Sequence, residues 1–380
     1  MKTLTTTALA LIAALGAAGP GLAEIRLGAS LSATGPASFL GDPEAKTLEM
    51  MVEALNAAGG IDGEPVELVL YDDGGDPNKA LTFATRLVED DEVVAIIGGS
   101  TTGTTMSILS VAEDNEIPFV SLAGAVSIVD PVRPFVFKTP HTDRMACEKI
   151  FTDMAARGIE KIGMISGTDG FGASMQAQCK DVVGQFGIEI VADETYGPKD
   201  ADVTPQLTKI RGTGGVQAVL NPGFGQGPAI VTRNYHQLGI DLPFYQSHGV
   251  ASDAFIELAG ADAAEGLRLP GTALLIAGQL AEDDPQRAVV QAYKAEFEAA
   301  YGMDVSTFGG YAHDAFALLV DAISRAGGDD PVAIRDALEA TSGLVGTTGT
   351  YSFSADDHLG LDLSAFRLLE IRDGGWVPVD

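Results

Sequence analysis

Short apolar runs alternate along most of the chain with segments whose apolar positions recur every three or four residues. The first run, 25–31, precedes a segment with apolar residues on one helical face, at Ala45, Leu48, Met51, Val52 and Leu55. A helix is therefore expected over 43–58. Strands are expected at 66–71, 93–98, 117–121, 135–138, 162–166, 188–192, 216–221 and 242–246, with helical segments between most of them. Such alternation predicts the α/β class, with parallel sheets covered by helices on both faces.

Two similar series of these units lie on either side of 131–143, a stretch that contains Pro131, Pro134 and Pro140. Because proline interrupts periodic segments, we expect the first crossing between two lobes here. Weaker interruptions suggest a second crossing near 269–271 and a third near 349–357. The predicted N-terminal lobe comprises 24–142 with 272–350, and the C-terminal lobe 143–271 with 351–380. The expected architecture is two Rossmann-like lobes joined by a three-strand hinge.

The N-terminal segment has the sequence pattern of an export signal. Lys2 precedes an uncharged stretch with an apolar middle, and Gly21-Leu22-Ala23 forms a small-x-Ala cleavage site. The alternative is a membrane anchor, but the strongly apolar part, 8–18, is too short to span a bilayer. We expect cleavage after Ala23 and a periplasmic protein.

Charge and cysteine content limit the partners and the chemistry. The 380 residues include 53 acidic and 23 basic ones, giving a formal net charge of −30 that disfavours nucleic acid and anionic lipid. A local cluster of donors can still hold a small anion. Cys147 and Cys179 are either a disulfide, which an oxidising compartment permits, or two free buried thiols. The five histidines lack metal-ligand spacing, and we expect no metal and no cofactor.

The strongest candidate for a binding loop follows the predicted strand 93–98. It reads Gly99-Ser100-Thr101-Thr102-Gly103-Thr104-Thr105 and then enters a helix. Ligands of open α/β sheets bind at the carboxyl ends of strands, where helix N-termini present free amide groups. Without a Gly-Lys-Ser/Thr sequence, the loop suits a carboxylate better than a triphosphate. The alternative is that its hydroxyls only cap the helix.

Equivalent loops occur in the second half of the chain. The segment 166–172 places Phe171 after a strand, either facing the cleft or covering its own loop. The segment Gly223-Phe224-Gly225-Gln226-Gly227 resembles a dinucleotide fingerprint but lacks its last glycine. His248 also follows a strand, and is either a ligand contact or a loop histidine bonded to backbone.

Catalytic signatures are missing. The sequence has no Gly-x-Ser-x-Gly, no arguable pair of carboxylates and no partner for acid–base catalysis by His248. We therefore expect a binding protein rather than an enzyme. Two rival classes, an exported sensor domain and an exported hydrolase on the same scaffold, have no sequence feature in their favour.

Several motifs together resemble the type I periplasmic solute-binding proteins of branched-chain amino acid ABC importers, along almost the whole mature chain. The motifs are Thr34-Gly35-Pro36, Asn56-Ala57-Ala58-Gly59-Gly60-Ile61, Tyr71-Asp72-Asp73 with Asp76-Pro77, and Ala263-Ala264-Glu265-Gly266. No single motif is specific to this family, but the order and spacing of the motifs together are. The resemblance implies a monomer that delivers a ligand to the permease subunits of an ABC importer.

The resemblance also implies roles for particular residues. The family holds the ligand carboxylate with the loop that Ser100, Thr101 and Thr102 occupy here, and Thr102 matches its hydroxyl donor. Leu40, Phe171 and Phe224 match positions that wrap the ligand side chain. The ligand ammonium is usually held by a loop matching Ala123, Gly124 and Ala125, with a threonine hydroxyl, and by a glutamate at the position of His248.

This chain departs from the family at the ammonium site, because Ala125 has no hydroxyl and His248 has no negative charge. A buried ammonium without an anionic partner costs several kcal/mol of desolvation. The loops at Ser100–Thr102, 121–124 and 247–249 are similar to a branch of the family associated with aromatic carboxylates. We therefore expect a flat aromatic or phenylpropanoid acid as ligand, with branched-chain amino acids as the second candidate.

Overall fold

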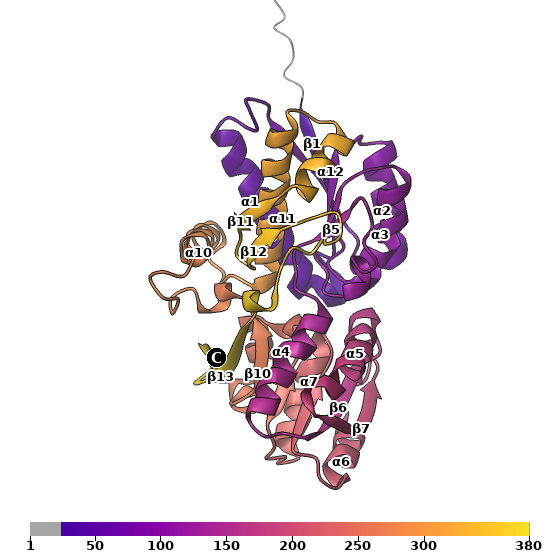
Figure 1. Cartoon of the computed structure of the whole chain (residues 1–380), viewed down its shortest axis with the longest axis vertical. Helices are drawn as coiled ribbons and strands as arrows, with labels where there is room; N and C mark the ends of the chain where they lie inside the picture. The colour runs from indigo at the N-terminus through magenta and orange to yellow at the C-terminus, as the bar shows by residue number, and fades with distance from the viewer. Residues whose placement is uncertain (1–23, 380) are drawn as a thin grey trace, which may run out of the picture.

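The computed structural model describes residues 24–379 as two lobes, each built around its own sheet (Figure 1). The predicted export signal, 1–23, lies outside the described residues. Within 24–379 every helix is too short or too polar to span a bilayer.

The first lobe contains a five-stranded sheet in the order β2-β1-β3-β4-β5, in which all neighbouring strands are parallel. Its strands are β1 (Ile25–Leu31), β2 (Val66–Asp72), β3 (Ala95–Gly98), β4 (Phe119–Ser121) and β5 (Val136–Lys138). β3, β4 and β5 are buried along their whole length, as expected for parallel strands with helices on both faces.

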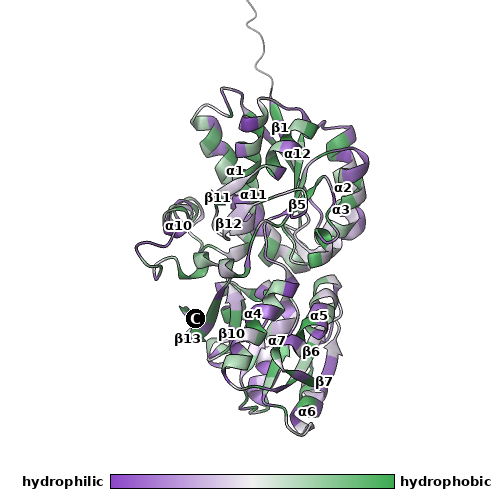
Figure 2. Cartoon of the chain, viewed as in Figure 1, coloured by the Kyte–Doolittle hydropathy of each residue, from purple (hydrophilic) through white to green (hydrophobic). Residues whose placement is uncertain are grey.

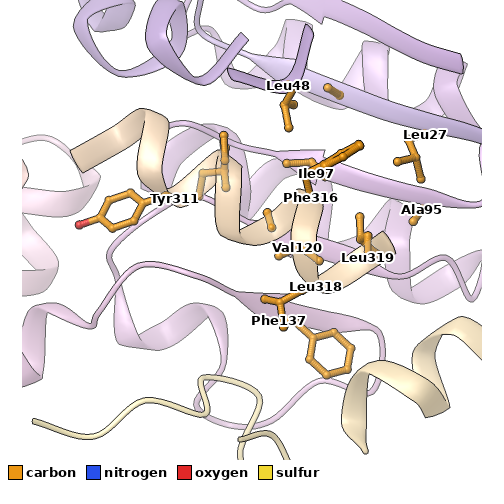
Figure 3. Packing of buried hydrophobic residues seen from close by; sticks show 14 of the residues in the cluster. Leu27, Leu48, Ala95, Ile97, Val120, Phe137, Tyr311, Phe316, Leu318 and Leu319 are labelled. Carbon is orange, nitrogen blue, oxygen red and sulfur yellow. The ribbon is translucent and has the colours of Figure 1, made fainter. Parts of the chain in front are cut away.

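Helices from distant parts of the chain cover this sheet. One face packs on α1 (Ser38–Ala57), α11 (Thr307–Ala326) and α12 (Pro331–Glu339), with a core that includes Leu27, Leu48, Ile97, Phe316 and Leu319 (Figure 3). The other face packs on α2 (Pro77–Glu89) and α3 (Thr102–Asp114). Figure 2 shows hydrophilic residues along the outer side of α2 and α3, which is the pattern of amphipathic surface helices.

The second lobe contains a seven-stranded sheet in the order β14-β13-β10-β9-β8-β6-β7. Its strands are β6 (Lys161–Gly167), β7 (Glu189–Tyr196), β8 (Ala218–Asn221), β9 (Phe244–Gln246), β10 (Arg268–Gly271), β13 (Arg367–Arg372) and β14 (Gly375–Pro378). β6 to β10 pair in parallel, whereas β13 and β14 add an antiparallel edge. The helices before β10 are α4 (Asp143–Ala156), α5 (Gly170–Val182), α6 (Thr204–Gly212), α7 (Gln226–Gln237), α8 (Asp253–Ala259) and α9 (Ala261–Ala264).

Further elements are α10 (Arg287–Tyr301) and the hairpin of β11 (Ser342–Val345) and β12 (Thr350–Ser352), besides short 3-10 helices in the connecting loops. Tyr293 and Phe297 of α10 pack in the same core cluster as Leu269 of β10. Cys147 of α4 and Cys179 of α5 form a disulfide, so the bonded alternative holds for this pair.

The predicted α/β class and the two lobes with parallel central sheets are confirmed. The expected start of the first helix at Pro43 was wrong: α1 begins at Ser38 and contains Pro43 in its second turn. The lobe limits stay a prediction. The packing argues for a third crossing later than 349–357, because Tyr351 and Phe353 belong to the core beside β1, while the chain joins the second sheet only at β13.

The strand order repeats in both lobes. β2-β1-β3-β4-β5 and β7-β6-β8-β9-β10 are the same arrangement, so the chain changes direction across each sheet at one point, between β1 and β3 and between β6 and β8. Such switch points leave a crevice at the carboxyl ends of the strands, and ligands of open α/β sheets bind there. The loops at 99–102 and 168–171 both start at these crevices.

Candidate functional site

A cavity lies between the lobes at the two switch points. Its volume is about 40 Å³, room for roughly three water molecules. The residues that line it come from both lobes: Leu40, Ser100, Thr101, Thr102, Leu122, Gly124, Pro140, Phe171, Phe224, His248, Gly249, Phe308 and Tyr311. A ligand of the size of an amino acid fits only if these side chains move or the lobes separate.

The loop between β3 and α3 divides its hydroxyl groups between helix capping and the cavity. Thr101 is the N-cap of α3: its Oγ1 accepts from the Thr104 backbone N–H at 3.1 Å, and Thr104 Oγ1 accepts from the Thr101 backbone N–H at 3.1 Å. Thr102 is buried, and among the described residues its Oγ1 has no hydrogen-bond partner. The capping alternative therefore holds for Thr101, while Thr102 keeps a free hydroxyl beside the cavity.

Ser100 connects the cavity to the interior of the first lobe. Its Oγ accepts a hydrogen bond from the Ser32 backbone N–H at 2.9 Å and forms a second, short hydrogen bond with Oε2 of Glu44. Glu44 is completely buried in α1 and does not line the cavity. Burial raises the pKa of Glu44 to about 8, so its carboxyl group is largely protonated at neutral pH.

The second lobe contributes aromatic rings. Phe171 lies in the first turn of α5, where the carboxylate of Asp169 accepts from the backbone N–H groups of Phe171 and Gly172 at 3.0 Å each. The Phe171 ring lies 6.2 Å from Phe224 and 5.3 Å from the His248 ring, both edge to face. Phe171 was expected either to face the cleft or to cover its own loop. Its ring lines the cavity and also packs in the core of the second lobe, so each alternative holds in part.

His248 lies buried in the turn after β9. Neither ring nitrogen has a hydrogen-bond partner among the described residues, so the histidine is not held by backbone as the alternative supposed. Burial and the nearby charge of Lys138 lower the pKa of His248 to about 3. The ring is therefore neutral, and offers one N–H donor and one acceptor nitrogen.

Lys138 is buried at the end of β5, under the loops that contain Gly124 and Pro140. Its Nζ donates to the backbone oxygens of His141 at 3.3 Å and Ala125 at 3.4 Å. Burial lowers the pKa of Lys138 to about 7, and the charge of Asp143 partly opposes this shift. Lys138 is thus a source of positive charge close behind the cavity wall that titrates near neutral pH.

Of the other predicted residues of the first lobe, some line the cavity and others face the core of the lobe. Leu40 and Gly124 line the cavity. Ala123 and Ala125 do not line it in the described chain, because their side chains pack in the core beside β3 with Ile96 and Phe119. Side chains of an extended segment alternate between two faces, and here Leu122 and Gly124 are the ones that face the cavity.

Sequence reasoning missed five lining residues: Leu122, Pro140, Gly249, Phe308 and Tyr311. Tyr311 is the most informative of them. It lies in the second turn of α11, it is 3% exposed, and its hydroxyl has no hydrogen-bond partner among the described residues. The apolar pattern of α11 marks this position as core, so no local signal separates it from its neighbours.

The cavity can therefore accept a small ligand with polar groups of its own. Among the described residues that line it, the polar side-chain groups without partners are those of Thr102, His248 and Tyr311, and none is charged at neutral pH. Leu40, Phe171, Phe224 and Phe308 supply apolar surface. A surface groove of about 490 Å³ shares Thr101, Thr102, Phe171 and Phe224 with the cavity and lies next to it.

Comparisons with known proteins agree with this architecture. A family model described as periplasmic binding protein matches residues 24–375. The leucine-, isoleucine-, valine-, threonine- and alanine-binding protein of Pseudomonas aeruginosa is 28% identical over 312 residues, which cover 81% of this chain and 80% of that protein. The Leu/Ile/Val-binding protein homolog 3 of Brucella melitensis is 26% identical over 384 residues and the whole length of both chains. The crystal structure of an extracellular ligand-binding receptor from Rhodopseudomonas palustris HaA2 is 30% identical, with a TM-score of 0.87 over 94% of this chain and 100% of that one.

Proposed function

Because the chain belongs to the type I periplasmic binding proteins of the branched-chain amino acid family, we propose that it binds a small carboxylate between its lobes for an ABC importer. The family is a solute-binding class, and the chain is a substrate-binding protein of that class. The proposed partners are the permease subunits of the importer. Export to the periplasm after removal of 1–23, and action as a monomer, belong to the same proposal.

One observation carries the choice of site: three buried polar groups without partners line one interlobe cavity. They are Thr102 Oγ1, the ring nitrogens of His248 and the hydroxyl of Tyr311. Buried polar groups in folded proteins are nearly always hydrogen-bonded, so a cluster of exceptions supports a missing partner with hydrogen-bonding groups of its own. The hydroxyl of Thr102 and one N–H of His248 suit a carboxylate, since both can donate to it.

The lining favours an aromatic acid over an amino acid as ligand. The described residues around the cavity include no ionised carboxylate that could neutralise an ammonium group. Phe171, Phe224 and Phe308 can stack on a flat ring. Amino acids remain the second candidate, because the Pseudomonas aeruginosa relative is named for binding five of them.

Capture would proceed by closure of the lobes. A carboxylate first meets the hydroxyl and amide donors of the loop at Ser100–Thr102, and Phe171, Phe224 and His248 of the second lobe then cover it. The small cavity volume supports a movement of the lobes, because a ligand of the size of an amino acid does not fit in about 40 Å³. The importer would recognise the closed form.

Titration calorimetry of purified, ligand-stripped protein tests this proposal. We expect 4-hydroxybenzoate or coumarate to bind more tightly than leucine. Tighter binding of leucine would replace the aromatic acid by an amino acid, and no binding of any carboxylate would remove the proposed function. Mass spectrometry of small molecules that co-purify with the protein gives an independent identification.

A further inference from the structure

Glu44 is a buried carboxyl group that ligand capture, as proposed above, does not use. It lies directly behind Ser100, to which its Oε2 is hydrogen-bonded, and its relative exposure is 0%. Its second oxygen, Oε1, has no hydrogen-bond partner among the described residues. Glu44 does not line the cavity but Ser100 does, so the hydrogen bond to the serine hydroxyl links this carboxyl group to a bound ligand.

The protonation state of Glu44 decides whether the Ser100 hydroxyl can donate a hydrogen bond into the cavity. A serine hydroxyl carries one proton and can accept two hydrogen bonds. Ser100 Oγ already accepts from the Ser32 backbone N–H at 2.9 Å. When Glu44 is ionised it can only accept, so the Ser100 proton points to Glu44 and away from the cavity. When Glu44 is protonated it donates to Ser100 Oγ, and the serine proton is free to point into the cavity.

The surroundings of Glu44 favour the protonated form. The titratable groups that face it are Asp73, at the end of β2, and Tyr311 on α11, and neither is a cation. On α1 itself, Lys46 is bonded to Asp42 at 2.6 Å at the partly exposed side of the helix. Burial raises the pKa of Glu44 to about 8, the hydrogen bond from Ser100 opposes this rise, and the charge of Asp73 adds to it. An oxygen without a donor, Oε1, is also less costly on a neutral carboxyl group than on a carboxylate.

We propose that a carboxylate ligand binds at Ser100 together with a proton on Glu44, so that the serine hydroxyl donates to the ligand and no second negative charge remains beneath it. This inference rests on the proposed function, because it assumes that the cavity binds a carboxylate. Glu44 is a positioning residue in this scheme, since it acts on the ligand through Ser100.

The scheme predicts proton uptake that depends on pH. Below the pKa of Glu44 the proton is already present, and affinity does not change with pH. Above it, each bound ligand takes up a proton and affinity falls about tenfold per pH unit. With a pKa of about 8, the wild-type protein should take up about half a proton per ligand at pH 8 from this residue and almost none at pH 6.

Calorimetric titration with benzoate, whose charge is constant from pH 6 to pH 9, measures both effects. Titrations in two buffers with different ionisation enthalpies give the number of protons taken up. Glu44→Gln keeps the side-chain size, and its amide can donate to Ser100 at every pH. We expect this variant to bind as well as the wild type at pH 6, to lose the Glu44 share of proton uptake at pH 8, and to show a smaller fall in affinity between pH 8 and pH 9 than the wild type.

Two controls identify the residue responsible. Glu49→Gln changes an exposed glutamate of the same helix and should behave as the wild type. Lys138, with its pKa lowered to about 7, can also take up a proton when an anion binds, and only uptake that disappears in Glu44→Gln belongs to Glu44. Wild-type affinity that is equal at pH 6 and pH 9 would overturn the inference, as would unchanged pH dependence in Glu44→Gln.

Failure of this inference can be distinguished from failure of the proposed function. If wild-type protein at pH 6 binds neither benzoate, coumarate nor leucine, the proposed function fails. The protonated state of Glu44 is then tested without a ligand, by the pH dependence of unfolding described below. If Glu44→Gln does not fold, absence of proton uptake by the wild type at pH 8 still overturns the scheme.

Discussion

At the scale of residues, neighbouring threonines at the start of α3 have different surroundings. The hydroxyl of Thr101 is used by the capping box with Thr104, whereas that of Thr102 has no partner among the described residues. Substitution of Thr101 would therefore disturb the helix end and the site together. Thr102 is the better probe of binding alone.

Thr102→Val should weaken carboxylate binding by about 1–3 kcal/mol, because the ligand loses a donor while the shape of the side chain is kept. The free energy of unfolding should not fall, since the hydroxyl makes no internal hydrogen bond. Calorimetry and urea unfolding measure the two effects. Thr82→Val, at an exposed position of α2 that does not line the cavity, is the control for binding. Equal affinity in Thr102→Val and wild type would remove Thr102 from the site.

Glu44 should also make stability depend on pH in the absence of ligand. Its pKa is raised to about 8 in the folded protein, so between its ordinary value of 4.5 and about 8 the folded state binds more protons than the unfolded state. The stabilisation is complete below pH 4.5 and is lost as pH rises through 8. We expect the difference in unfolding free energy between wild type and Glu44→Gln to change by about 1.4 kcal/mol per pH unit in this range. A difference that is constant from pH 5 to pH 8 would show that Glu44 has no raised pKa.

The structure brings together several residues that were predicted from loops following strands, while their role in binding stays a prediction. Thr102, Phe171, Phe224 and His248 all lie within about four residues of the end of a strand, and all of them line one cavity. Tyr311 and Phe308 could not be found in this way, because they lie inside a helix whose apolar pattern indicates core. Ala123 and Ala125 were expected in the site because of the resemblance, but alternation along an extended segment turns their side chains away.

At the scale of elements, the disulfide links α5, the helix that contains Phe171, to α4. Cys147 and Cys179 join α4 to α5 over a sequence separation of 32 residues. The Cys147→Ala/Cys179→Ala variant should lose about 2–4 kcal/mol of unfolding free energy, mainly because the unfolded chain gains freedom. Urea unfolding with and without dithiothreitol measures this loss. The reductant should lower the stability of the wild type and leave the variant unchanged, and equal stability of both proteins would contradict the expectation.

The order of β1 to β9 was predictable because most buried parallel strands are short apolar runs. β10 was not predicted as a strand, because Arg268, Pro270 and Gly271 leave only one aliphatic residue in it. The antiparallel edge of β13 and β14 was not predicted. These strands lie after the segment that returns from the first lobe, and no local sequence pattern indicates that β13 pairs with β10. The first helix was shortened in the prediction because Pro43 was taken as its first residue, whereas α1 tolerates that proline in its second turn.

At the scale of the whole molecule, Gly124 lies where the lobes meet. A Cβ added there would lie 2.8 Å from Cε2 of Phe171 and 2.9 Å from Nε2 of His248. Both contacts are shorter than a Cβ atom tolerates, so a side chain at this position would force the rings of Phe171 and His248, or the lobes that carry them, to shift. The first lobe therefore meets the second through a position that has no side chain.

Gly124→Ala should hinder the proposed closure and weaken ligand binding about tenfold or more, in line with the usual cost of overpacking. Small-angle X-ray scattering should show a larger radius of gyration for the ligand-saturated variant than for the ligand-saturated wild type. Gly212→Ala, at the end of α6 where an added Cβ meets no atom within 4 Å, is the control. Full affinity in Gly124→Ala would show that the closed arrangement does not require a glycine here.

The packing of α1 against α11 also fixes the order in which the chain can fold as it is made. β5, the last strand of the first sheet, ends at Lys138, but α11 begins only at Thr307, and the entire parallel part of the second sheet is synthesised between them. A ribosome delivers the amino end first, so the part of the first sheet's apolar face that α11 and α12 cover stays exposed while the second lobe is completed. Chains that stop before Thr307 should therefore aggregate through that face, although every strand of the first sheet is present.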